Sequence, residues 1–111
     1  MSAGREAAGQ DPELVVLAAL RDAGWNFRPW VEGQQTLGIV GSFSDKDFTD
    51  AVFIADRHDV RAVRLLADTP GSKGGVVWDY TGTLTDAVSE LLALPAPRTR
   101  LAPQLVIAKW P

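Results

Sequence analysis

The sequence contains no cysteine among its 111 residues, which excludes disulfide bonds and thiolate-bound metal ions. Long apolar runs are missing as well. The longest extends from Leu14 to Leu20, whereas a helix needs ~20 apolar residues to cross a bilayer. Residues 1–10 lack the apolar stretch of a secretory signal. We therefore expect a cytoplasmic protein that does not bind a membrane.

Dense clusters of positive charge are also missing. The chain has 14 acidic and 11 basic residues, for a net charge of −3, and its bases are scattered. Proteins that bind nucleic acids usually carry a basic stripe, because they neutralise several phosphates. We therefore expect no nucleic-acid partner. The excess of arginine over lysine and the abundant alanine are typical of a GC-rich genome and indicate a bacterial source.

The remaining composition is that of an ordinary globular domain, with 46% apolar and 23% charged residues. A first helix is predicted over residues 12–23. Asp11 can cap its free N–H groups, Pro12 suits its first turn and Gly24 suits its C-terminal cap. Residues 1–10 show no periodicity, and we expect them to form a disordered arm.

Four further segments have the alternation or the apolar composition of β-strands. Residues 25–31 contain Pro29, which favours an edge strand. Residues 36–43 alternate apolar and polar side chains. Residues 51–55 are apolar throughout, which predicts a central strand buried on both faces. Residues 76–80 form the last core strand.

A second helix is predicted after this strand, with Thr83 as its N-cap. Its expected apolar stripe consists of Leu84, Ala87, Val88, Leu91 and Leu92. Prolines end the helix, so residues 95–103 are interpreted as a proline-rich linker. The apolar segment 104–111 is expected to dock on the domain or on a partner, because such a segment is prone to aggregate when it is left in water.

Residues 57–68 allow two interpretations. A strand after a hairpin turn is favoured by the β-branched Val60 and Val63. A helix would instead create a β-α-β unit. The predicted fold over residues 11–94 is therefore a single α+β domain with an N-terminal helix, a mostly antiparallel sheet of four to five strands, and a second helix on the same face after the last core strand. The alternative is a small α/β domain with one β-α-β unit at residues 51–80.

The motif Asp-Tyr-Thr-Gly-Thr-Leu-Thr occupies residues 79–85, at the end of a predicted strand. It resembles the phosphorylation signature Asp-Lys-Thr-Gly-Thr-Leu-Thr of P-type ATPases, and also the first motif of the haloacid-dehalogenase-like phosphotransferases. In those families the aspartate attacks a phosphoryl group and Mg²⁺ neutralises charge. The resemblance implies a phosphoryl-transfer domain in which Asp79 is the nucleophile.

Two positions depart from these patterns. Tyr80 stands in place of the lysine of the P-type signature, and Thr81 stands in place of the second aspartate of the phosphatases. Only one lysine and two acidic residues follow Asp79, which is few for the rest of a catalytic set. A strand, a turn and a helix cap account for the same residues without catalysis. We therefore predict that the protein is not an enzyme, with phosphoryl transfer by Asp79 as the alternative.

Candidate metal ligands are few. His58 lies between Asp56 and Asp59, and such a set can hold a metal ion. A lone histidine in a polar turn is usually solvated instead. The aspartates Asp45, Asp47 and Asp50 lack the spacing and the glycine of a calcium loop. We therefore expect neither a metal nor a cofactor.

Four tryptophans are many for so short a chain: Trp25, Trp30, Trp78 and Trp110. Core or boundary positions explain most of them, but tryptophan is also favoured where proteins bind each other. Trp30, on a predicted edge strand, and Trp110, in the C-terminal segment, are the candidate partner-binding residues. We predict a small bacterial accessory or regulatory protein that binds another protein or itself. A nucleic-acid-binding module is a further alternative.

Overall fold

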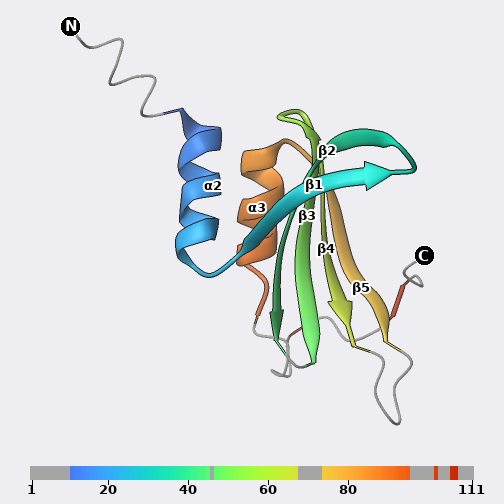
Figure 1. Ribbon diagram of the computed structural model, residues 1–111. Coiled ribbons are helices and arrows are strands. Elements are labelled where there is room, and N and C mark those ends of the chain that lie inside the picture. Colours follow the sequence, from blue (N-terminus) through green and yellow to red (C-terminus); the bar gives the residue numbers. More distant parts are fainter. Residues whose placement is uncertain (1–10, 46, 68–73, 96–101, 103–105, 108–111) are drawn as a thin grey trace, which may run out of the picture.

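The computed structural model describes residues 11–45, 47–67, 74–95, 102 and 106–107 of the chain. The elements, in chain order, are α2 (Pro12–Asp22), β1 (Asn26–Glu32), β2 (Gln35–Asp45), β3 (Phe48–Asp56), β4 (Asp59–Leu66), β5 (Gly75–Gly82) and α3 (Leu84–Leu92). The strands form one antiparallel sheet in the order β1-β2-β3-β4-β5. Both helices lie on the same face of this sheet (Figure 1). The predicted α+β fold is therefore confirmed.

Both helices begin at the capping residues that the sequence predicts. The Asp11 carboxylate accepts the Glu13 N–H at 2.9 Å, and the Thr83 hydroxyl accepts the Asp86 N–H at 3.1 Å. The interaction with the Glu13 side chain, and then the hydrogen bond from the Glu13 backbone N–H, lowers the pKa of Asp11. This contribution to stability is therefore present above the ordinary pKa of an aspartate, and is lost as the pH falls through the lower pKa of the folded state.

The described part of segment 57–68 contains a turn and the strand β4, which forms a hairpin with β3. A turn at Arg57 and His58 leads into β4. Val60 and Ala62 are fully buried beneath the helices, whereas Arg61 between them is exposed. This period of two is that of a strand. The favoured interpretation is confirmed, and the alternative α/β domain with a β-α-β unit at residues 51–80 is wrong.

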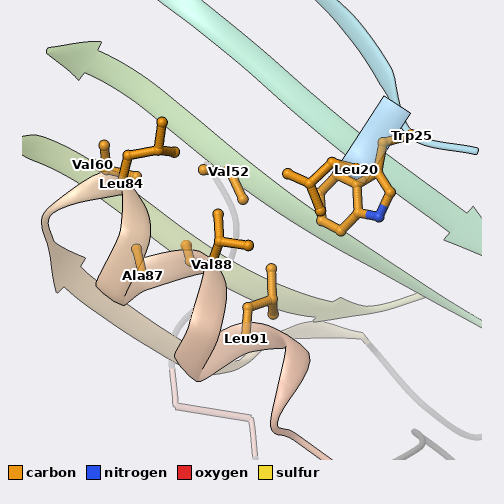
Figure 2. Packing of buried hydrophobic residues seen from close by; sticks show 9 residues of the cluster. Leu20, Trp25, Val52, Val60, Leu84, Ala87, Val88 and Leu91 are labelled. Atoms are coloured by element: carbon orange, nitrogen blue, oxygen red, sulfur yellow. The ribbon is translucent and has the colours of Figure 1, made fainter. Parts of the chain in front are cut away.

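The main hydrophobic core lies between the helices and the sheet. Figure 2 shows the side chains of α3 pointing toward those of the strands, with Leu20 and Trp25 closing the cluster at the end of α2. Leu92 is 60% exposed, so its place in the predicted stripe is wrong. It follows the buried Leu91, and one residue turns a helix by about 100°. The cluster consists of Leu20, Trp25, Val52, Val60, Ala62, Leu84, Ala87, Val88 and Leu91.

A buried ion pair holds the end of α3 against the sheet. Asp50 and Arg64 are cross-strand partners, and their side chains are 11% and 5% exposed. The guanidinium donates to both carboxylate oxygens, from Nε at 2.8 Å and from Nη2 at 3.0 Å. Its Nη1 donates to the carbonyl oxygen of Pro95, just after α3, at 2.6 Å. The guanidinium also lies 5.5 Å from the ring centroid of Phe48, so one arginine joins the helix end to two strands.

β2 is long and curved (Figure 1). Its residues 35–38 lie beside β1 alone, residues 39–42 pair with both β1 and β3, and residues 43–45 pair with β3 alone. Gly38 directly precedes Ile39, the first β2 residue that pairs with β3, and has a φ of 157°. A Cβ atom at this position would overlap the carbonyl oxygen of Ile54 and lie 3.0 Å from the Cα of Ala55. Only glycine therefore lets the two backbones approach this closely.

The sheet face opposite the helices is also partly buried. The alternation of side chains places Val40, Ala51 and Val63 on this face. All three are buried, although none belongs to the cluster beneath the helices. At the free edge of β5, the N–H of Ile107 donates to the carbonyl oxygen of Val76 at 2.7 Å. Figure 1 shows this C-terminal piece beside β5, away from the helices.

The predictions for the two ends of the chain fall mostly outside the described residues. The arm at residues 1–10 lies wholly outside them, as do most of the linker at 95–103 and most of the segment 104–111. Docking of the C-terminal segment therefore stays a prediction. The hydrogen bond of Ile107 contributes one contact to it.

Deleting residues 104–111 is expected to lower the melting temperature without changing the mass of the particle in solution. The deletion removes the hydrogen bond between Ile107 and Val76 and bares the edge of β5. Each kcal/mol lost lowers the melting temperature of a domain this small by about 4–8 °C. Thermal unfolding and light scattering measure the two quantities. An unchanged melting temperature contradicts docking, and a halved mass shows that the segment joins two chains.

Candidate functional site

A groove lies on the sheet face opposite the helices. Its volume is about 470 Å³, within the range of ligand-binding sites in proteins. Eleven described residues line it, and they come from β1, β2, β3 and β4. Four of the lining residues, Arg28, Pro29, Trp30 and Val31, belong to the edge strand β1, which therefore forms one side of the groove.

Trp30 is the largest side chain among the described residues that line the groove. It is half-buried and packs edge-to-face on Phe53, with ring centroids 5.3 Å apart and ring planes at 67°. Trp30 pairs with Gly38 across the β1–β2 ladder, so no side chain of that partner separates the indole from β3. Such an aromatic pair is favourable beyond its buried area. The structure thus places the candidate partner-binding residue Trp30 in a groove, beside a second aromatic ring.

The polar part of the groove consists of one cation and three hydroxyl groups. Arg28 is exposed, and no carboxylate in the described residues lies within ion-pair distance of it. The hydroxyls of Ser44 and Thr49 lie 2.8 Å apart, and Ser42 lies on the same face. No aspartate or glutamate occurs among the described lining residues. The groove therefore suits a ligand with an apolar group and a negative charge.

Asp79 lies on the same sheet face but outside this groove. It is three residues from the end of β5 and pairs with Val63 across the ladder. Its carboxylate accepts a hydrogen bond from the Nη2 of Arg61 at 3.2 Å, and the two side chains are 46% (Arg61) and 44% (Asp79) exposed. The expectation that Asp79 ends its strand is therefore wrong. The strand continues through Thr81 and Gly82, because both still pair with β4.

Replacing Asp79 by asparagine is expected to change the free energy of unfolding by at most about 1 kcal/mol, because the ion pair with Arg61 is exposed to solvent. We also expect no phosphorylation of the wild-type chain by acetyl phosphate. Urea denaturation and mass spectrometry are the measurements, and Asp79→Asn is the control for the second. A phosphoryl group that disappears in Asp79→Asn contradicts the prediction that the protein is not an enzyme.

The other sequence candidates are dispersed. Asp56 accepts the backbone N–H of His58 at 3.0 Å in the exposed β3–β4 turn. Asp50 is buried in its ion pair with Arg64, on the helix-covered face. No cluster of three or more histidine, cysteine, aspartate or glutamate residues that suits a metal is present in the part of the chain that the structure describes.

The tryptophans occupy different environments. Trp25 is buried in the core and lies 6.3 Å from the ring of Phe43. Trp78 is half-buried and stacks on Tyr80 with a centroid distance of 6.3 Å. Trp110, the second candidate partner-binding residue, lies outside the described residues. Trp30 is thus the described tryptophan that lines the groove.

Arg28, Phe53 and the groove hydroxyls were not predicted as site residues from the sequence. The signal for them is the alternation of the strands. Arg28 and Trp30 share one face of β1, and Ser42 and Ser44 share one face of β2. Nothing in the sequence indicates how β1 lies relative to β3 and β4, so the four strands cannot be assembled into one groove from alternation alone.

Comparisons with protein-family models, with curated proteins and with solved structures gave no match. No helix within the described ranges is long and apolar enough to span a membrane.

Proposed function

We propose that this chain is a non-catalytic accessory or regulatory protein that binds a segment of a partner protein in the groove around Trp30. The observation that supports this proposal most strongly is the position of Trp30, half-buried on Phe53 in a groove of about 470 Å³. Tryptophan is enriched among the residues that dominate binding energy at protein interfaces, especially where it fills a pocket with its ring already packed.

The composition of the groove favours a protein segment as its ligand. Apolar side chains from four strands lie beside hydroxyl groups that can donate to or accept from a peptide backbone. The described lining contains no carboxylate and no histidine, the side chains most often used for general acid–base catalysis. An extended peptide presents both side chains and backbone groups to such a surface, so it can use the apolar and the polar parts together.

The free edge of β1 is a poorer docking point than the groove. Strand addition needs a row of backbone N–H and C=O groups, and Pro29 in the middle of β1 has no N–H to offer. Proline on an edge strand is one of the ways by which proteins prevent pairing with other chains. The partner is therefore expected to lie across the sheet face.

Trp30→Ala is expected to weaken partner binding by at least about 2 kcal/mol, because it removes the apolar centre of the groove. The measurement is selection of displayed random peptides on the wild-type chain, followed by titration calorimetry of the best peptides with each variant. Trp30→Phe keeps an aromatic ring against Phe53 and is expected to lose less than Trp30→Ala. Circular dichroism and a melting curve establish that both variants are folded.

Leu92→Ala is the matched control, since Leu92 is a large, 60% exposed apolar residue on α3, on the other face of the sheet. It is expected to leave peptide affinity unchanged. The proposed function is wrong if folded Trp30→Ala binds the selected peptides as tightly as the wild type does. It is also wrong if Leu92→Ala lowers the peptide affinity as much as Trp30→Ala does, because the groove is then not the binding site.

A further inference from the structure

The described lining of the groove carries one formal charge, that of Arg28. Arg28 is exposed and has no ion-pair partner among the described residues. Arg61, the other arginine on this face, is already paired with Asp79. A partner that fills the groove therefore meets a positive charge that nothing in the described lining balances. Complementary charge across an interface fixes the register of the partner and suppresses wrong partners.

The spacing of Arg28 and Trp30 restricts the partner further. They lie two residues apart on one face of β1, so their backbone positions are roughly 7 Å apart at a rise of about 3.3 Å per residue. Two side chains at positions i and i+2 of an extended peptide also share one side and have the same separation. An extended peptide laid along β1 can thus place a carboxylate on Arg28 and an apolar side chain on Trp30.

We propose that the partner supplies an extended acidic segment, in which an aspartate or glutamate stands two residues from an aromatic or large aliphatic residue. The carboxylate pairs with the Arg28 guanidinium, and the apolar side chain packs on Trp30 and Phe53. This inference rests on the proposed function and names the chemistry of the partner at the same site.

The hydroxyl groups complete the site. Of the Ser44 and Thr49 hydroxyls, 2.8 Å apart, one donates its hydrogen to the other. The second hydroxyl therefore keeps a hydrogen that it can donate to a carbonyl oxygen of the segment. Ser42, nearer to β1 in the same groove, offers a further donor. Backbone recognition of this kind is independent of the side chains of the segment.

A peptide is favoured over a single-stranded nucleic acid for a physical reason. A nucleic acid carries a negative charge at every phosphate, and its affinity depends on several bases that displace counterions. The described lining offers one basic side chain, that of Arg28, and the chain as a whole has a net charge of −3. A segment with a single carboxylate matches this surface, whereas a polyanion is repelled by the rest of the chain.

The test is a charge exchange with synthetic peptides taken from the selection on the wild-type chain. Arg28→Glu is expected to lower the affinity for peptides that carry the acidic residue by at least about fivefold, because it turns an attraction into a repulsion. The same variant is expected to bind better than the wild type when lysine replaces the acidic residue of the peptide. Moving the acidic residue next to the apolar one is expected to weaken binding to the wild type.

Arg21→Glu is the matched control, because it makes the same change in net charge at an exposed position of α2, on the other side of the sheet. It is expected to leave the affinities of all peptides nearly unchanged. If Trp30→Ala abolishes binding but Arg28→Glu binds acidic and lysine peptides equally, the acidic segment is wrong while the proposed function stands. If a single-stranded oligonucleotide binds the groove more tightly than the peptides do, the inference is overturned in favour of a nucleic acid.

Discussion

Asp50→Ala is expected to lower the free energy of unfolding by about 3–5 kcal/mol, the cost of leaving one member of a buried ion pair without its partner. The Arg64 guanidinium, whose side chain is 5% exposed, would lose two hydrogen bonds from Nε and Nη2. Its bond to the Pro95 carbonyl and its contact with Phe48 would remain. A loss of this size is a large part of the stability of a small domain.

Urea denaturation of the wild type, Asp50→Ala and the double variant Asp50→Ala with Arg64→Met measures the effect. The double variant is expected to recover part of the loss, because methionine carries no charge that needs a partner. A single variant that loses less than 1 kcal/mol, or a double variant that is less stable than Asp50→Ala, contradicts the role assigned to the pair.

Gly38→Ala is expected to lower the free energy of unfolding by about 3 kcal/mol, as a sum of overpacking and backbone strain. The added Cβ would overlap the carbonyl oxygen of Ile54, and backbone atoms cannot turn aside as the end of a side chain can. Gly33→Ala is the control: Gly33 also has a positive φ, of 64°, but its Cβ would meet nothing within 4 Å. Gly33→Ala is expected to lower the free energy of unfolding by about 1 kcal/mol.

Equal losses in Gly38→Ala and Gly33→Ala would show that the positive φ matters and the approach of β2 to β3 does not. The expected difference also bears on the groove. Gly38 is the ladder partner of Trp30, so a shift of β2 at this point would move the indole relative to Phe53. Peptide affinity is therefore expected to fall together with stability in Gly38→Ala.

Local signals predicted most of the elements. The caps Asp11 and Thr83 fix the starts of both helices through hydrogen bonds within three residues. The β-branched Val60 and Val63 favoured a strand over a helix for this segment, and the structure confirms it as β4. These features depend on neighbours in the sequence, and for that reason the sequence alone reveals them.

Features that join distant residues were not predicted. Asp50 and Arg64 are 14 residues apart and meet only because β3 and β4 pair in one register. The contact of Trp30 with Phe53 joins β1 to β3 at the place where Gly38 approaches the backbone of Ile54. A glycine in a strand does not reveal which backbone will approach it. The candidate site was therefore predicted only in part, as Trp30 on an edge strand.

The strand extensions show the same limit at a smaller scale. β2 runs on through the polar Ser44 and Asp45, and β5 runs on through Thr81 and Gly82. These residue types are common in turns, but each of the four residues pairs with a neighbouring strand. Ladder hydrogen bonds from an adjacent strand outweigh the local preference of the residue, so the ends of the strands could not be placed from composition.

The proposed binding of an extended acidic segment in the groove around Trp30 is tested most directly by NMR. The spectra are those of the ¹⁵N-labelled chain during titration with the tightest acidic peptide from the selection. We predict that the indole N–H of Trp30 and the backbone N–H groups of Arg28, Ser42 and Thr49 shift most. Shifts centred instead on the exposed Leu14 of α2 or Leu92 of α3, with Trp30 unmoved, would contradict the claim.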